Sequence, residues 1–111
     1  MSFFIKLLIR TIAISVAAYI VPGVVVENFW VAVVAAIVLG LLNSVLKPIL
    51  LILTIPINIL TLGLFTLVIN TFIILLTSNI VSGFSVNSFG AAFIFSIILW
   101  LVNWFLESIS R

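Results

Sequence analysis

Few side chains in this 111-residue chain could carry out chemistry. It has four Lys and Arg residues, two Asp and Glu residues, and neither histidine nor cysteine. Without histidine the commonest general base and metal ligand is missing, and without cysteine there is no thiol nucleophile, thiolate metal site or disulfide. Motifs for phosphate loops, catalytic triads, metal clusters and paired catalytic carboxylates are absent from the sequence. The sequence therefore predicts a protein that is not an enzyme and that uses no cofactor or metal.

Among the other polar residues, we single out three asparagines inside apolar stretches, Asn43, Asn70 and Asn103. Amides in apolar helices usually hydrogen-bond to a neighbouring helix, which contributes roughly 0.6–2 kcal/mol each. Alternatively, the three amides line a polar path for water or ions. A proton-coupled transporter would need an acidic residue deep in a helix, whereas Glu27 and Glu107 both stand at the edges of apolar blocks.

Membrane helices must position these side chains. Hydrophobic residues make up 67% of the chain and charged residues 5%, and the mean hydropathy is +1.67. A soluble domain is about half apolar and about a quarter charged, so the surroundings of most of this surface must be lipid. The net charge of +2 comes from few charged groups, which argues against a nucleic-acid partner. We expect membrane lipids as partners.

Four apolar blocks are long enough to cross a bilayer core, which takes about 20 helical residues. The first carries Lys6 and Arg10 within its apolar run, so we interpret it as a retained transmembrane helix and not a cleaved signal. The four predicted spans are Phe3–Val21, Trp30–Leu46, Leu62–Val81 and Gly90–Leu106.

The second half of the chain resembles the first at an offset of 60 residues. Between Ile20–Leu46 and Ile80–Leu106, 11 of 27 positions are identical, including Gly23/Gly83, Phe29/Phe89 and Asn43/Asn103. This composition alone would give roughly one identity in ten. The predicted fold is thus an all-α membrane protein of four transmembrane helices in a single domain, 1–111. It consists of two tandem, like-oriented helical hairpins, about 3–47 and 62–107, with an apolar, Pro-containing linker over 48–61.

The basic residues orient these helices. If the N-terminus is cytoplasmic, two crossings return the chain to the cytoplasm at Lys47 and four return it at Arg111. All four basic residues, Lys6, Arg10, Lys47 and Arg111, are then inside, as the positive-inside rule requires. Glu107 corresponds to Lys47 at the offset of 60, and we expect it at the same inner interface, paired with Lys47 or Arg10. Both termini are predicted to be cytoplasmic.

The linker is unusually apolar for a loop, and its structure is left open between two alternatives. In the favoured one, Lys47-Pro48 ends the second helix and Pro48 begins an interfacial or re-entrant segment. In the other, the second helix continues to about Thr54, with Pro48 kinking it and Lys47 extending towards the interface.

A face of small residues follows the second block at a spacing of four: Ala32, Ala36, Gly40 and Ser44. Small residues at this spacing let membrane helices approach closely, because packing drives their association in lipid. We expect this face to pack against another helix; the alternative is a pore lining.

The stretch Gly40–Leu76 resembles the bacterial four-transmembrane family that is grouped with phage holins. The resemblance rests on an Asn-x3-Lys-Pro segment followed by Leu-Thr-x-Pro, Thr-Leu-Gly-Leu-Phe and Ile-Asn, which here comprise Asn43, Lys47, Pro48, Thr54, Pro56, Thr61, Gly63, Phe65 and Asn70. Gly83-Phe84 and Pro22-Gly23 also fit the family pattern. The resemblance implies a compact, multi-pass protein of the bacterial inner membrane, and the holin label implies homo-oligomers that permeabilise that membrane.

Three functional hypotheses follow. The first is a self-associating membrane protein that affects permeability, and the second is an accessory subunit that packs against a larger membrane complex. The third, a small transporter or channel, is disfavoured by the lack of a deeply placed acidic residue.

The topology can be tested with reporter fusions placed after Val25, Leu50, Ser85 and Arg111. We expect cytoplasmic signals at Leu50 and Arg111 and external signals at Val25 and Ser85, because only that arrangement keeps every Lys and Arg inside. An external signal at Leu50 or Arg111 would show that the predicted topology is wrong.

Overall fold

The computed structural model describes residues 2–61 and 63–109, and it is helical apart from one short pair of strands. Each half of the chain contains two long apolar helices, and one short helix connects the two halves. The elements in order are α1 (Phe3–Ile20), β1 (Val24–Val26), α2 (Phe29–Leu53), α3 (Ile55–Leu60), α4 (Leu64–Ile80), β2 (Phe84–Val86) and α5 (Phe89–Ile109).

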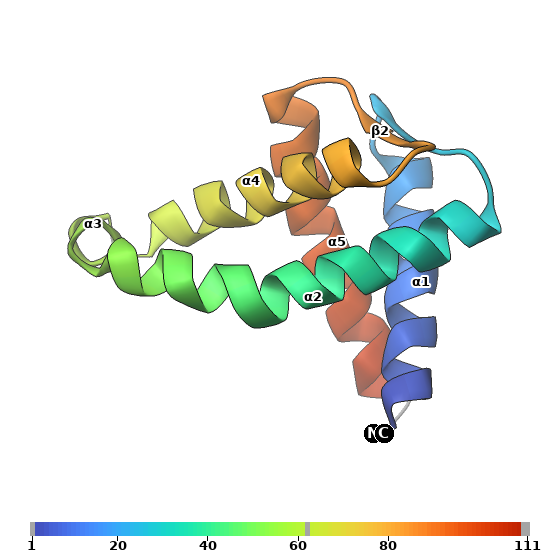
Figure 1. Ribbon diagram of the computed structural model, residues 1–111, viewed down its shortest axis with the longest axis horizontal. Coiled ribbons are helices and arrows are strands. Elements are labelled where there is room, and N and C mark those ends of the chain that lie inside the picture. Colours follow the sequence, from blue (N-terminus) through green and yellow to red (C-terminus); the bar gives the residue numbers. More distant parts are fainter. Residues whose placement is uncertain (1, 62, 110–111) are drawn as a thin grey trace.

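The four long helices form two pairs that cross each other (Figure 1). One pair is α1 with α5, and the start of α1 and the end of α5 lie together at its free end. The other pair is α2 with α4, which α3 joins at its own free end. Each helix also contacts its sequence neighbour across the crossing, α1 with α2 and α4 with α5. The halves of the chain are therefore interleaved, because each helix pair takes one helix from each half.

Length and composition make three of these helices candidates for membrane spans: α1, α2 and α5. The fourth, α4, is equally apolar in character but has 17 residues, at the short end of the range of about 17–25 that spans a bilayer. An apolar helix satisfies its backbone hydrogen bonds internally, which lipid cannot do for it. These helices agree with the all-helical architecture predicted from the sequence.

The two strands pair with each other and tie the halves together at one end. They are antiparallel, with Val24 opposite Val86, Val25 opposite Ser85, and Val26 opposite Phe84. Each strand spans three residues, which is too short for an alternating pattern to be detected in the sequence. The prediction of an all-α fold with plain loops at these positions therefore missed this ribbon.

A glycine precedes each strand and closes the ribbon reciprocally. Gly23 and Gly83 both have φ of +91°, a left-handed conformation that only glycine adopts without steric cost. The Gly23 carbonyl accepts a hydrogen bond from the Asn87 backbone N–H at 2.7 Å, and the Gly83 carbonyl accepts one from the Glu27 N–H at 3.0 Å. Each half of the chain thus closes the strand of the other.

The following helices begin in the same way in both halves. The Asn28 side chain accepts a hydrogen bond from the Val31 N–H at 3.0 Å, and the Ser88 hydroxyl accepts one from the Ala91 N–H at 3.2 Å. These side chains satisfy N–H groups that have no partner within the helix.

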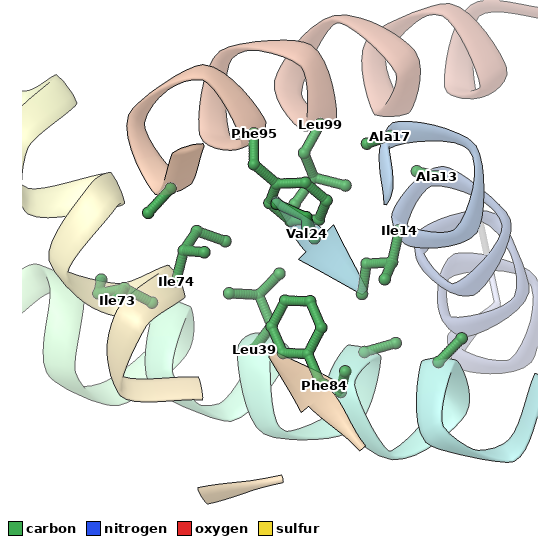
Figure 2. Packing of buried hydrophobic residues seen from close by; sticks show 14 of the residues in the cluster. Ala13, Ile14, Ala17, Val24, Leu39, Ile73, Ile74, Phe84, Phe95 and Leu99 are labelled. Atoms are coloured by element: carbon green, nitrogen blue, oxygen red, sulfur yellow. The ribbon is translucent and has the colours of Figure 1, made fainter. Parts of the chain in front are cut away.

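The buried core lies between the helix pairs, on the side of the strands (Figure 2). Phe84 and Phe95 pack with their ring centroids 5.8 Å apart, and Val24 and Leu39 lie beside them. Buried hydrophobic residues begin at Ile9 in α1 and Ile69 in α4, and end at Leu39 in α2 and Leu99 in α5. The half of each helix remote from the strands contributes little to this core.

Pro48 lies inside α2, which continues to Leu53. The favoured interpretation, that the second helix ends at Lys47 and a linker occupies 48–61, is therefore corrected in favour of its alternative. Pro48 removes one intrahelical hydrogen bond, but continuing the helix keeps the later N–H groups bonded in a setting without water. The helix ends instead at Thr54, whose hydroxyl donates to the Leu50 carbonyl at 2.8 Å, and Pro56 lies in the first turn of α3.

Alanine substitutions at three glycines should separate conformational strain from steric overlap. Gly83→Ala should destabilise the protein most, because it combines a positive φ with a new Cβ 2.8 Å from Cγ2 of Val31. The left-handed conformation costs roughly 1–2 kcal/mol for a non-glycine residue, and overpacking costs typically about 1–3 kcal/mol more. Melting curves in a mild detergent would measure the difference.

Two further glycines provide the controls. Gly63 has a φ of +88° with no atom within 4 Å of an added Cβ, and Gly90 has neither a positive φ nor a close neighbour. Gly63→Ala should therefore show only the conformational cost, and Gly90→Ala should melt at or above the wild-type temperature. Equal melting temperatures for Gly83→Ala and Gly90→Ala would contradict the role given to the ribbon.

Candidate functional site

A polar cleft of about 120 Å³ lies in the half of the molecule remote from the strands. All four long helices line it, each through its strand-remote part or through the margin of the core. The lining residues are Arg10, Leu39, Asn43, Lys47, Asn70, Ile73, Ile74, Ser96, Leu99, Trp100 and Asn103. Polar side chains predicted from the sequence as separate features thus come together in one place.

Arg10 of α1 is half-buried and reaches across to α2 at Gly40. A Cβ added at Gly40 would lie only 2.8 Å from Nη1 of Arg10, which is closer than real Cβ contacts allow. The missing side chain at position 40 therefore makes room for the guanidinium. The sequence predicts Gly40 as part of a helix-packing face. In the structure, the space beside Gly40 holds the guanidinium of Arg10.

The corresponding positions in the second half hold the opposite combination of sizes. At an offset of 60, Arg10 corresponds to Asn70 and Gly40 corresponds to Trp100. Asn70 and Trp100 both line the cleft, from α4 and α5, which pack against each other. A long side chain beside glycine in one half is thus matched by a short side chain and a tryptophan in the other. Close packing makes such paired changes of volume interdependent.

The three asparagines are each half-buried and all line the cleft. Within residues 2–61 and 63–109, the side-chain amides of these three asparagines form no hydrogen bond. Every fully buried side-chain N or O atom in the same two ranges has a hydrogen-bond partner. The arrangement differs from the predicted cross-helix hydrogen bonds. The amides line the cleft together with apolar side chains, and a path for water or ions stays a prediction.

The remaining charges surround this cleft unequally. Lys47 is half-buried and lines it, while Lys6 is exposed and lies on a second groove between α1 and α2. Glu107 of α5 acts electrostatically on Arg10, and its pairing with Lys47 or Arg10 stays a prediction. Arg111, predicted at the same interface, lies outside the described residues.

The small face of α2 is buried over only part of its length. Ala32 and Ala36 have at most 1% of their surface exposed, whereas Gly40 is half-buried and Ser44 is exposed. Ala36, Gly40 and Ser44 line the second groove together with residues of α1. The predicted close packing therefore describes the part near the strands, where the core lies.

Sequence reasoning missed Ser96 as a cleft residue. It is buried, and its hydroxyl donates to the Phe93 carbonyl at 2.8 Å. Its position corresponds to Ala36 at the offset of 60, so the repeat itself was a signal for it. In the described part of the chain, no three His, Cys, Asp or Glu side chains gather where they could hold a metal ion.

Comparison with known proteins identifies relatives of this chain. A family profile described as mycobacterial four-transmembrane-segment phage holin, superfamily IV, matches residues 1–105. An uncharacterised protein of Streptomyces coelicolor is 36% identical, over 96% of this chain and 94% of its own length. The uncharacterised membrane protein YvlD of Bacillus subtilis is 31% identical, over 86% of this chain and 81% of its own. No solved structure matches the chain.

The match over nearly the whole chain shows that this protein belongs to the four-transmembrane phage holin superfamily IV. The resemblance stated from the sequence motifs is confirmed. The relatives also agree with a membrane protein, which the apolar helices indicate independently.

The size matching around the cleft predicts energetic coupling between positions 10 and 40. Gly40→Trp alone should lower the melting temperature, because overpacking typically costs about 1–3 kcal/mol. Adding Arg10→Asn copies the Asn70 and Trp100 combination of the other half and should restore part of the loss. Melting curves of the wild type, both single variants and the double variant together form a double-mutant cycle. Residues in contact couple by about 0.5–3 kcal/mol, so strictly additive effects would refute the contact.

Proposed function

We propose that this member of the holin superfamily is a non-enzymatic, multi-pass protein of the bacterial cytoplasmic membrane that affects the permeability of that membrane. We infer that both termini and Lys47 lie on the cytoplasmic side, as the positive-inside rule favours. The observation that carries the proposal is the polar cleft, which enters the helix assembly from the strand-remote end and stops at the apolar core.

A cleft of this kind shortens the apolar barrier without abolishing it. Irregular or polar surface at membrane depth is tolerated where it lines a water-filled space, and the half-buried amides of Asn43, Asn70 and Asn103 provide such a lining. Beyond them, Phe84 and Phe95 are 2% and 0% exposed and fill the space towards the strands. The described conformation is thus a closed one, in which permeation requires these rings to move.

Self-association extends the same proposal to larger solutes. A cleft of about 120 Å³ has the volume of about four water molecules at liquid density, so no folded protein can cross a single copy. Release of a protein therefore needs a lesion between several copies. The strand-remote part of α5 offers Trp100, Trp104 and Phe105, each more than half exposed, as a surface for a second copy.

We also infer that the chain is two copies of one hairpin unit, duplicated at an offset of 60. The identities in the sequence support this, as do the equal φ values of Gly23 and Gly83 and the reciprocal hydrogen bonds of the ribbon. The strand register, in which Val25 and Ser85 are opposite each other, is the one that a two-fold relation between such units requires.

Purified protein in lipid vesicles tests the permeability proposal. Phe95→Ala should raise the efflux of small ions above that of the wild type, because it removes the ring that closes the cleft from the strand side. The substitution should also destabilise the protein by about 3–5 kcal/mol, so size-exclusion chromatography must first show a folded sample. Phe95→Leu keeps the site apolar and filled, and it should retain most of the closure.

Phe89→Ala is the matched control, since Phe89 lies on the same helix, is 53% exposed and is not part of the surface proposed for a second copy. It should leave efflux at the wild-type level. Vesicles that hold Phe95→Ala and leak no faster than empty vesicles would overturn the proposal. If the protein instead purifies with another membrane protein in constant ratio and is inert alone, the accessory-subunit hypothesis takes its place. Cross-linking in the membrane would test the self-association directly.

A further inference from the structure

The cleft gathers positive charge and hydrogen-bond donors without an acidic lining. Its polar lining includes the guanidinium of Arg10, the ammonium of Lys47 and the amides of Asn43, Asn70 and Asn103. All five groups carry N–H donors, and they come from all four long helices. Neither of the two carboxylates in the sequence lines the cleft.

These donors are not committed to protein partners. In the described ranges, the Arg10 guanidinium and the three amides take part in no hydrogen bond, although each is half-buried. Glu107 acts on Arg10 from α5 and offsets one of the two positive charges, so the other remains. A charged arginine within a membrane helix is costly, which argues for a partner.

The guanidinium of Arg10 lies in the space beside Gly40. Gly40 leaves the space that Nη1 occupies, since a Cβ there would approach to 2.8 Å. On the other side of the cleft, the larger side chain of Trp100 stands where the first half has glycine. A planar guanidinium that lines an open cleft is suited to bidentate recognition of an oxyanion.

We propose that this cleft binds a phosphate group, with Arg10 as the bidentate donor, Lys47 as a second positive charge, and the asparagine amides as donors to the remaining oxygens. The volume of about 120 Å³ accommodates a phosphate group and leaves the rest of a larger ligand outside. Phosphate of this kind comes from the headgroup of an anionic phospholipid or from free phosphate. The inference concerns binding alone and does not rest on the permeability proposal.

Tryptophan fluorescence can report binding, because Trp100 lines the cleft and the chain has three tryptophans. Trp30→Phe and Trp104→Phe leave Trp100 as the reporter in full-length protein. This protein, in a phosphate-free detergent, is titrated with phosphatidylglycerol, with inorganic phosphate and with diacylglycerol, which has the acyl chains without the phosphate. We expect a saturable change with at least one phosphate-containing probe and none with diacylglycerol.

Three variants in the same background assign the binding to the cleft. Arg10→Gln should weaken it about tenfold or more, the scale of a lost charge-assisted hydrogen bond. Lys47→Gln should weaken it to a smaller extent, and it decides the question if Arg10→Gln does not fold. Lys6→Gln is the matched control: Lys6 is exposed on the same helix as Arg10 and does not line this cleft, so binding should change less than about twofold.

Each outcome bears on the proposal. Binding of phosphatidylglycerol alone supports it and identifies a lipid headgroup as the source, while binding of inorganic phosphate supports it with a free ligand. Equal binding of diacylglycerol, no response to any probe, or wild-type binding by both Arg10→Gln and Lys47→Gln overturns it. The assay has no gradient or vesicle, so a failure here is separate from a failure of the efflux experiment.

Discussion

The reciprocal closure of the two strands is the constraint on which the rest of the structure depends. Gly23 and Gly83 take a conformation that other residues adopt only with strain, and each carbonyl accepts a backbone N–H from the opposite half. This exchange gives both irregular segments backbone partners that the helices do not supply. It also fixes where four helices meet. The core of Phe84, Phe95 and their neighbours gathers beside this junction, and burial declines with distance from it.

The cleft follows from the same arrangement. All four long helices, which cross as two pairs, contribute polar side chains to this space, next to core residues such as Leu39 and Leu99. Arg10 is the most demanding of them, because an isolated charge inside a bilayer is costly. Its position over Gly40 gives it access to the cleft and to the carboxylate of Glu107. Packing and electrostatics therefore act on one side chain, which is why the proposed functions centre on it.

The helices could be predicted from the sequence because hydrophobicity alone specifies them in a membrane. The offset of 60 also identified pairs whose environments agree in the structure, such as Gly23 with Gly83. The continuation of α2 through Pro48 was predicted only as the less favoured alternative, because a proline disfavours a helix locally. The cost of unpaired backbone groups in lipid favours continuing the helix. The ribbon was missed because three residues carry no usable period.

The convergence of the cleft residues could not be predicted from the sequence either. Asn43, Asn70 and Asn103 were recognised as unusual, but their meeting place depends on which helix faces which, and small-residue patterns do not specify that. Ser96 went unnoticed because a single serine in an apolar helix normally bonds to its own backbone, as this one does. The close approach of Arg10 to Gly40 could not be predicted either, because it depends on how two helices pack. It brings a charged group of one helix to the space left by a missing side chain on the other.

Arg10 with Gly40 in one half and Asn70 with Trp100 in the other are unlike pairs. A single chain can combine such pairs around one cavity, whereas an assembly of identical subunits cannot. Identical subunits meeting across a two-fold axis present every residue twice, so any ionised group at their shared cavity occurs in even number. Two guanidinium groups confined there would repel each other, and removing the arginine would leave none. Because both halves belong to one polypeptide and differ in sequence, the cavity can hold an odd number of ionised groups. One half supplies a single arginine beside a glycine, and the other half has an asparagine and a tryptophan at the matching positions.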